Sequence, residues 1–248
     1  MRKLRVIRMV GLAISFLVLV IRPGNASESV KVAILDSGSN IAYKEGISLI
    51  GNTVKDDNGH GTLIAGVIKE TCPEAELYII KVIGKDGLAI NEETVILGLK
   101  WAISKNVNVI NMSLRLRGSD ELRDAIRQAY EKGIVMTAAA GNTTSAIGAL
   151  EARDAMRPGH YEVAYPARYP EVIAVGALDR YGRAYEGSIG GRKVEVFCKG
   201  YSGRKAGTSI ASAYAAGIAA KIISGNTGYG VEEIRCFMKG KYGKAGIR

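Results

Sequence analysis

The chain has 248 residues, enough for one large domain with its own hydrophobic core. Its 34 basic and 24 acidic side chains leave only a mild excess of +5 once the first 26 residues, which hold five basic and no acidic residues, are set aside. No basic run alternates with aromatic residues, so we expect no nucleic-acid partner. The three cysteines form no Cys-x-x-Cys or Cys/His cluster, so we expect no zinc site and one disulfide at most.

Residues 1–26 predict a secretory signal peptide. Four basic residues precede a largely apolar run of 13 residues, 9–21, and Gly24 and Ala26 put small residues where a signal peptidase cleaves. Because 13 residues are short for a helix that spans a bilayer, a cleaved leader and a secreted, extracellular product are favoured. The alternative is an uncleaved signal anchor in residues 9–21, which would hold the protein at a membrane.

After the leader, strands and helices alternate along the chain. Strands are expected at residues 30–35, 76–83, 107–112, 134–140, 172–175 and 194–197, and helices at 62–69, 92–105, 120–132, after Ser209, and at 231–238. Asn91 is expected to cap the second helix, and Gly133 to end the third. Residues 143–161 and 184–205 are expected to form long surface connections.

This alternation predicts the fold class. Nearly continuous apolar strands separated by helices are typical of a three-layer α/β fold, in which helices cover both faces of a mostly parallel, twisted β-sheet. Ligands of such folds bind at the carboxyl ends of the strands. Asp36, Ser113 and Asn142 all lie at predicted strand ends, which points to a functional site there.

Two residues at predicted helix starts suit hydrolytic chemistry. Ser209 follows the turn Gly207-Thr208 before an Ala-rich helix, and the first turn of a helix favours developing negative charge. His60 opens another helix from a glycine-flanked turn, where an imidazole can project as a general base. A hydrolytic serine needs such a base and a carboxylate that fixes its tautomer, and Asp36 can supply that carboxylate.

Asn142 completes the set, because its amide and the backbone N–H of Ser209 can both donate to an oxyanion. Taken singly, each residue has an ordinary alternative: Ser209 can cap a helix, and Asp36 and Asn142 can form turns. The four together, in the order Asp, His, Asn, Ser, form a far more specific pattern. The other histidine, His160, lies in a turn-like setting and is expected to be an exposed surface residue.

The segments around these residues resemble those of the subtilisin-like serine proteases, the subtilases (peptidase family S8). The resemblance extends from Val30 to Ile222 and rests on residues 32–38, 60–66, 139–142 and 207–211. Residues 165–176 are also similar to the segment that enters a strand behind the catalytic cleft of that family. The resemblance implies a subtilisin-like fold and a serine endopeptidase that cleaves protein or peptide substrates through an acyl-enzyme.

By this resemblance, Asp36, His60 and Ser209 are the catalytic triad, and Asn142 belongs to the oxyanion hole. Residues 111–114 are similar to the strand edge that pairs with an extended substrate in subtilases. Ser113, Leu114 and Arg115 are therefore the candidate substrate-binding residues. Where subtilases often have glycines after this segment, the chain has Arg115-Leu116-Arg117, which leads us to expect a narrower cleft or a preference for acidic substrate residues.

Other departures concern the helix after Ser209, calcium and folding. Subtilases usually have Met and Pro at the positions of Ile210 and Ala213, and both replacements are compatible with a buried helix.

Only ten residues separate Gly66 from Leu77, so we expect no calcium at the loop that many subtilases insert there. A calcium site elsewhere in the chain remains an alternative, and no other cofactor is expected. The predicted catalytic domain, residues 27–248, follows the leader directly, so we expect no propeptide and either unaided folding or a folding helper in trans.

Two other functions remain as alternatives to a general endopeptidase. One is a catalytically idle subtilase-like domain that serves as a binding module, although the intact set of Asp36, His60, Asn142 and Ser209 opposes it. The other is a dedicated processing protease or peptide ligase that acts on one partner protein. No P-loop, dinucleotide fingerprint, His-Glu-x-x-His or Gly-x-Ser-x-Gly motif points to a different enzyme class.

Overall fold

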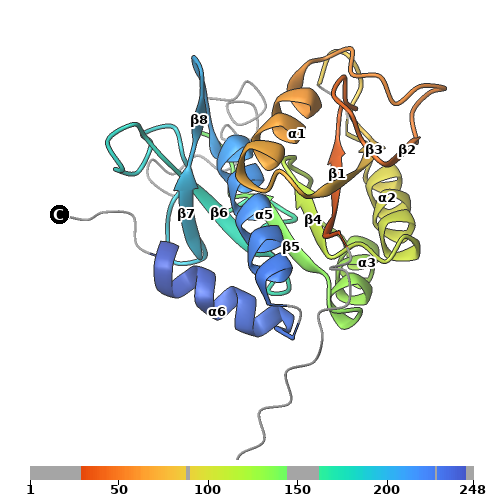
Figure 1. Ribbon diagram of the computed structural model, residues 1–248. Coiled ribbons are helices and arrows are strands. Elements are labelled where there is room, and N and C mark those ends of the chain that lie inside the picture. Colours follow the sequence, from red (N-terminus) through yellow and green to blue (C-terminus); the bar gives the residue numbers. More distant parts are fainter. Residues whose placement is uncertain (1–28, 88–89, 144–161, 227, 244–248) are drawn as a thin grey trace, which may run out of the picture.

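The computed structural model describes residues 29–87, 90–143, 162–226 and 228–243 (Figure 1). The predicted leader, and all but the first residue of the connection predicted at 143–161, lie outside the described residues. Seven strands form one sheet in the order β2-β3-β1-β4-β5-β6-β7, and every neighbouring pair is parallel. Their bounds are β1 (Lys31–Asp36), β2 (Glu45–Ser48), β3 (Glu76–Lys81), β4 (Val109–Met112), β5 (Val135–Ala139), β6 (Ile173–Leu178) and β7 (Val196–Lys199).

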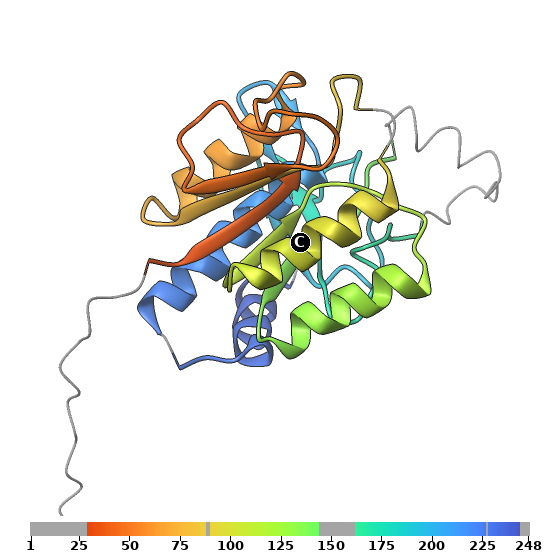
Figure 2. The ribbon, with the colours of Figure 1, turned by 90° about the vertical axis from the view of Figure 1, so that its right-hand side faces the viewer.

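Helices cover both faces of this sheet, which confirms the predicted three-layer α/β fold. One face carries α1 (His60–Thr71), α5 (Thr208–Gly225) and α6 (Val231–Tyr242), and the other carries α2 (Glu92–Ser104) and α3 (Asp120–Glu131). Successive side chains of a strand point to opposite faces, so Val32 and Ile34 of β1 pack with α1 and α5, while Ala33 and Leu35 pack toward α2 and α3. Figure 2 shows α2 and α3 (yellow and green) across the sheet from α1 and α5 (orange and blue).

The predicted helix ends are formed by local interactions. The Asn91 side chain accepts a hydrogen bond from the Glu93 N–H at the start of α2, and Ser119 caps α3 in the same way through the Leu122 N–H. Gly133, just past the end of α3, has a φ of 77°, a conformation that glycine adopts without a Cβ penalty. These caps confirm the boundaries expected around Asn91 and Gly133.

Two features differ from the sequence-based expectations. The edge strand β2 was not predicted, because Glu45–Ser48 is short and lacks an alternating apolar pattern. The strand expected at 194–197 is confirmed by β7, but the segment expected as a surface connection at 184–205 also leads into an unpredicted antiparallel hairpin, β8 (Tyr201–Ser202) and β9 (Lys205–Ala206). Buried Ile189 and Val194 anchor this segment to the core below α3, so it is not a free loop.

The sheet order fixes where a ligand would bind. From β1 the chain moves to β2 and β3 on one side, and then crosses to β4 on the other. The carboxyl ends of β1 and β4 therefore mark the switch point of the sheet, where ligands of open α/β folds bind. Leu35 pairs with Met112, so Asp36 and Ser113 follow at adjacent strand ends at this point.

All three cysteines, which lie within the described residues, are free thiols. Cys72 and Cys198 are buried, and burial raises the pKa of the Cys198 thiol to about 12. Both buried thiols therefore stay protonated and unreactive at neutral pH, whereas Cys236 is exposed. Packing, rather than a disulfide within this part of the chain, stabilises the fold.

Candidate active site

An aspartate–histidine pair lies at the carboxyl end of β1. Nδ1 of His60, the first residue of α1, is 2.8 Å from Oδ1 and 3.0 Å from Oδ2 of Asp36. The Asp36 side chain is 0% exposed and that of His60 is 33% exposed, so solvent reaches the imidazole but not the carboxylate. An Nδ1–H that donates to the buried carboxylate leaves Nε2 as the proton acceptor, the tautomer that a general base needs.

A second buried carboxylate, Asp56, holds the loop that leads into His60. Its Oδ1 accepts hydrogen bonds from the Ser37 hydroxyl (2.9 Å) and from the Asn58 and Gly59 N–H groups (3.0 and 2.8 Å). Its Oδ2 accepts from the Thr62 N–H (2.8 Å) and hydroxyl (2.6 Å). Asp56 thus caps α1 from outside the helix and joins the turn after Asp36 to the turn before His60.

The two turns also approach each other through their glycines. The Gly61 N–H donates to the Ser37 hydroxyl at 2.8 Å, and a Cβ on Gly61 would lie only 2.2 Å from the Gly38 carbonyl oxygen. Any larger residue at Gly61 would push the start of α1 away from the end of β1. Gly61 therefore permits the short distance between Asp36 and His60.

The pKa values of His60 and Asp56 are both shifted. The Asp36 carboxylate raises the pKa of His60 above its ordinary value of 6.5, against the opposing effects of desolvation and of the Lys205 charge. Burial raises the pKa of the Asp56 carboxyl, but hydrogen bonds from Thr62, Gly59 and Ser37 outweigh it, and the pKa lies below its ordinary value. Asp56 is therefore ionised at neutral pH.

Ser209 lies in the first turn of α5, where the backbone geometry depends on Gly207. Gly207 has a φ of 154°, and a Cβ there would lie 3.2 Å from Nδ2 of Asn142. The Ser209 hydroxyl donates a hydrogen bond to the backbone carbonyl of Ser113 at 3.4 Å. Among the described residues, it forms no hydrogen bond with His60. His60 and Ser209 are thus bonded to residues at the carboxyl ends of neighbouring parallel strands, β1 and β4.

The Asn142 carboxamide lies directly against the start of α5. Its Oδ1 accepts hydrogen bonds from the Thr208 N–H (3.0 Å) and hydroxyl (3.2 Å), and that hydroxyl oxygen accepts from the Gly141 N–H (3.2 Å). Both carboxamide atoms lie close to Gly207, where an added Cβ would be 3.2 Å from Nδ2 and 3.3 Å from Oδ1. Asn142 is therefore oriented by the residue that precedes Ser209.

A buried polar network joins α5 to the sheet beneath Ser209. The Ser113 hydroxyl donates to the Ser209 carbonyl (2.9 Å) and accepts from the Asn111 amide (3.0 Å). Asn111 in turn accepts from the Ser212 hydroxyl at 2.8 Å and from the Thr137 hydroxyl at 3.3 Å. These side chains are fully or almost fully buried, so the network fixes the first turn of α5 on β4 and β5.

The segment with a free backbone edge for a substrate is shorter than the sequence suggested. Residues up to Met112 belong to β4, which is paired with β1 on one side and β5 on the other, so they present no free edge. Only the segment after Met112 can offer its backbone to a peptide. In that segment the side chains of Ser113 and Leu114 are buried, whereas Arg115 is partly exposed.

Within the described ranges, no group of three or more His, Cys, Asp or Glu side chains is arranged to hold a metal ion. In that part of the chain, no helix has the length and apolar character needed to cross a bilayer.

Asp56 is the residue at this site that the sequence-based reasoning did not identify. It lies four positions before His60 in a polar turn next to a second aspartate, Asp57, so its composition suggests only a solvated loop. In the structure Asp56 is 4% exposed, whereas the Asp57 side chain is 50% exposed. The Asp-x-x-Gly-His spacing was the available signal, since it puts a carboxylate within reach of the first N–H groups of a helix.

Comparisons with known proteins agree with this architecture. The chain is 34% identical over 231 residues to a thermostable alkaline protease of Halalkalibacterium halodurans (83% of this chain, 60% of the relative), and 34% identical over 229 residues to subtilisin E of Bacillus subtilis (81% and 57%). It thus spans about three fifths of the length of these curated relatives. The crystal structure of a cold-adapted subtilisin-like serine proteinase has a TM-score of 0.70 at 24% identity and covers 87% of this chain and 82% of that one, which supports the fold. The model of the subtilase family (peptidase S8) matches residues 27–245, so the chain belongs to the subtilase family.

Proposed function

We propose that the chain is a secreted serine endopeptidase that hydrolyses peptide bonds through an acyl-enzyme on Ser209. The observation that carries the proposal is the pair formed by the buried Asp36 carboxylate and the partly exposed His60 imidazole at the end of β1, next to the end of β4 where the Ser209 hydroxyl is bonded. A buried carboxylate on Nδ1 and a partly exposed imidazole are what serine activation requires. Family membership supports the same reaction class.

In the proposed reaction, the Ser209 oxygen attacks the carbonyl carbon of the scissile peptide bond, and Nε2 of His60 takes the hydroxyl proton. Asp36 stabilises the resulting imidazolium. The negative charge on the carbonyl oxygen is stabilised by the Asn142 amide and the Ser209 backbone N–H. As the C–N bond breaks, His60 gives the proton to the leaving amine, and a water molecule then releases the acyl group by the reverse sequence.

The 3.4 Å contact between the Ser209 hydroxyl and the Ser113 carbonyl is compatible with this proposal. Hydrogen bonds of a catalytic serine are often long or misdirected before substrate binds, and they shorten in the complex. Rotation about the Ser209 Cα–Cβ bond redirects the hydroxyl without moving α5, so the resting contact does not block attack. Peptide backbone is expected to bind along the segment that begins at Ser113 and Leu114, with Arg115 at its exposed end.

A fluorophosphonate probe, which reacts with base-activated serines, tests this function on the full chain. We expect labelling of the unaltered protein, loss of labelling in both Ser209→Ala and His60→Ala, and unchanged labelling in Ser104→Ala, which removes an exposed hydroxyl at the end of α2. Absence of labelling in a demonstrably folded protein would contradict the proposal and favour an idle binding module. Adding an amine acceptor to a peptide digest separates hydrolysis from ligation, because a ligase transfers the acyl group to that amine.

Secretion is part of the same proposal and rests on residues 1–26. The expected result is protein in the medium of the producing cells whose N-terminal residue is Ser27, as N-terminal sequencing would read it. Retention of an intact N-terminus in the membrane fraction would contradict cleavage and support the signal anchor. A folding helper in trans is needed if the purified, unfolded protein refolds in much lower yield than the yield of folded protein obtained from the producing cells.

A further inference from the structure

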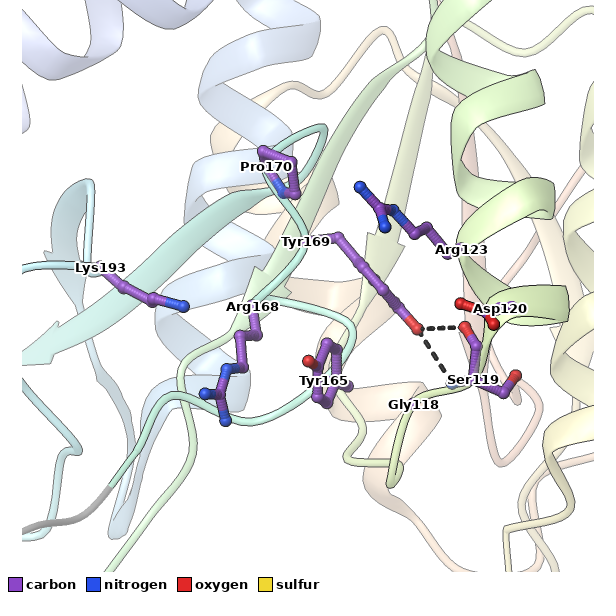
Figure 3. Close-up of a pocket in the computed structure, with 9 residues that line it drawn as sticks. All are labelled: Gly118, Ser119, Asp120, Arg123, Tyr165, Arg168, Tyr169, Pro170 and Lys193. Carbon is purple, nitrogen blue, oxygen red and sulfur yellow. Dashed lines mark hydrogen bonds between the residues drawn. The ribbon is translucent and has the colours of Figure 1, made fainter.

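A cavity of about 360 Å³ lies between the start of α3 and the segment around residues 165–170 (Figure 3). Two tyrosines form its wall: the rings of Tyr165 and Tyr169 are in contact, with their centroids 4.6 Å apart. The Tyr169 hydroxyl donates to the Ser119 carbonyl at 2.8 Å and accepts from the Ser119 N–H at 3.1 Å. Both tyrosines are therefore held in place, and the wall is a formed surface.

The same wall connects the cavity to the segment that follows β4. The Leu116 N–H donates to the Tyr165 carbonyl at 2.9 Å, and the two residues form an antiparallel bridge. A Cβ on Gly118 would lie 2.6 Å from the Tyr165 ring, so the chain packs closely under this tyrosine. The cavity is thus only a few residues along the chain from Ser113 and Leu114.

Positive charge surrounds the cavity. Arg123, Arg168 and Lys193 line it from three separate segments, whereas Asp120 is the single carboxylate among the lining residues that the structure describes (Figure 3). Arg168 lies over the Tyr165 ring and also pairs with Glu162, whose side chain is 68% exposed. Within the described residues, the side chains of Arg123 and Lys193 form no ion pair. Such a concave region of one sign attracts anionic groups, and arginine binds carboxylates with defined geometry.

We propose that this cavity binds carboxylate side chains from an acidic segment of the peptide substrate, outside the residues that flank the cleaved bond. Leu116, which pairs with Tyr165, puts the Tyr165 wall beside the far end of the segment along which the peptide is proposed to bind, and the cavity has room for one or two carboxylate side chains. The aromatic wall packs against the aliphatic part of a glutamate while the three cations meet its charge. The inference adds a second contact for the same substrate and so rests on the proposed function.

Direct binding tests the cavity independently of catalysis. The probe is fluorescein-labelled hexaglutamate, and its anisotropy is measured with the full-length Ser209→Ala protein in low salt. We expect Arg123→Gln with Lys193→Gln to weaken binding at least about fivefold, the scale of one exposed ion pair for each cation removed. The matched control, Arg127→Gln with Arg192→Gln, removes the same charge from exposed neighbours that do not line the cavity and should change binding less than about twofold.

Equal loss of binding in the two double variants would overturn the inference, because it would show attraction to net charge alone. Absence of hexaglutamate binding would overturn it too. In the catalytically intact protein, the cavity variant is expected to raise KM for a peptide with a glutamate extension about fivefold, without changing kcat or the KM of the glutamine-extended peptide. If that protein hydrolyses neither peptide, the proposed function fails, while the binding measurement still decides whether the cavity takes an acidic segment.

Discussion

The two halves of the candidate active site are held in different ways. On the base side, Asp36 and Asp56 are both buried, and hydrogen bonds tie the turn after β1 to the turn before His60. On the nucleophile side, the network below α5 fixes the backbone of Ser209, but the hydroxyl itself has one long contact with Ser113. The base is therefore fixed through its side chain, and the nucleophile only through its backbone.

This difference matches the demands of the proposed reaction. The imidazole must keep one tautomer and one orientation while it accepts and returns a proton, so rigid support lowers the cost of each step. The serine oxygen must leave its resting contact to reach a carbonyl carbon, so a weak contact is an advantage. The following changes alter one side at a time, from the largest expected effect to the smallest.

If Asn142 has its proposed role, Asn142→Asp is expected to lower kcat about 10²–10³-fold, the scale known for loss of an oxyanion-hole asparagine in subtilisin. Aspartate keeps an oxygen that accepts from Thr208, but it lacks the amide donor and adds negative charge where the oxyanion forms. Steady-state kinetics on one peptide substrate measure the effect, with the exposed Asn52→Asp as the control. A kcat within about threefold of the unaltered protein would remove Asn142 from the oxyanion hole.

Asp56→Asn is expected to lower kcat by about 10–10²-fold, because an amide nitrogen would face N–H or hydroxyl donors and displace the turn that carries His60. The unfolding temperature should fall as well. Measuring kcat well below that temperature separates misplacement of His60 from simple unfolding. Asp124→Asn, which removes an exposed carboxylate on α3, is the control, and a normal kcat for Asp56→Asn would show that the base side needs no second carboxylate.

Ser113→Ala is expected to lower kcat only about fivefold, the effect of removing the hydrogen bond to the Ser209 carbonyl, while the loss of the bond accepted from the Asn111 amide lowers the stability of the fold. The carbonyl of residue 113, which accepts from the Ser209 hydroxyl, remains in the variant. Kinetics with Ser104→Ala as a reference measure the change. A loss as large as that of Asp56→Asn would contradict the idea that the nucleophile side is the less tightly held half.

Lys205→Gln is expected to move the acid limb of the kcat/KM–pH profile to higher pH. Activity requires neutral His60, so it falls as pH drops through the pKa of this residue, which lies above 6.5. The positive charge of Lys205 lowers the pKa of His60, so removing that charge raises the pKa. Asp56→Asn removes a negative charge that raises the pKa of His60, so this variant should shift the acid limb to lower pH. Lys221→Gln, an exposed change farther along α5, should leave the profile in place.

Much of the fold could be predicted from the sequence because its signals are local. Apolar strands, helical spacing and caps such as Asn91 act within a few residues, and the strand-end rule then brings Asp36 and Ser113 to one edge of the sheet. The resemblance to subtilases added the roles of His60 and Ser209, which spacing alone left open.

The remaining features depend on contacts between distant segments. Asp56 and Asp57 are neighbours of the same type, and only the fold decides that one is buried and the other half exposed. Residues 111 and 112 look like a substrate edge until the sheet order puts β4 between β1 and β5. The three cations of the cavity are separated by tens of residues, so no window of sequence contains them together.

The side-by-side packing of α1 and α5 has a consequence for inactivation. These helices begin at the base and at the nucleophile, and they share one core cluster on the same face of the sheet (Figure 1). Neither helix can detach without exposing that cluster, so opening of the site and unfolding of the domain are one cooperative event. Hydrogen-bonded backbone amides in the middle of both helices should then exchange with deuterium at a common slow rate, and heat should abolish activity in the same transition that melts the sheet.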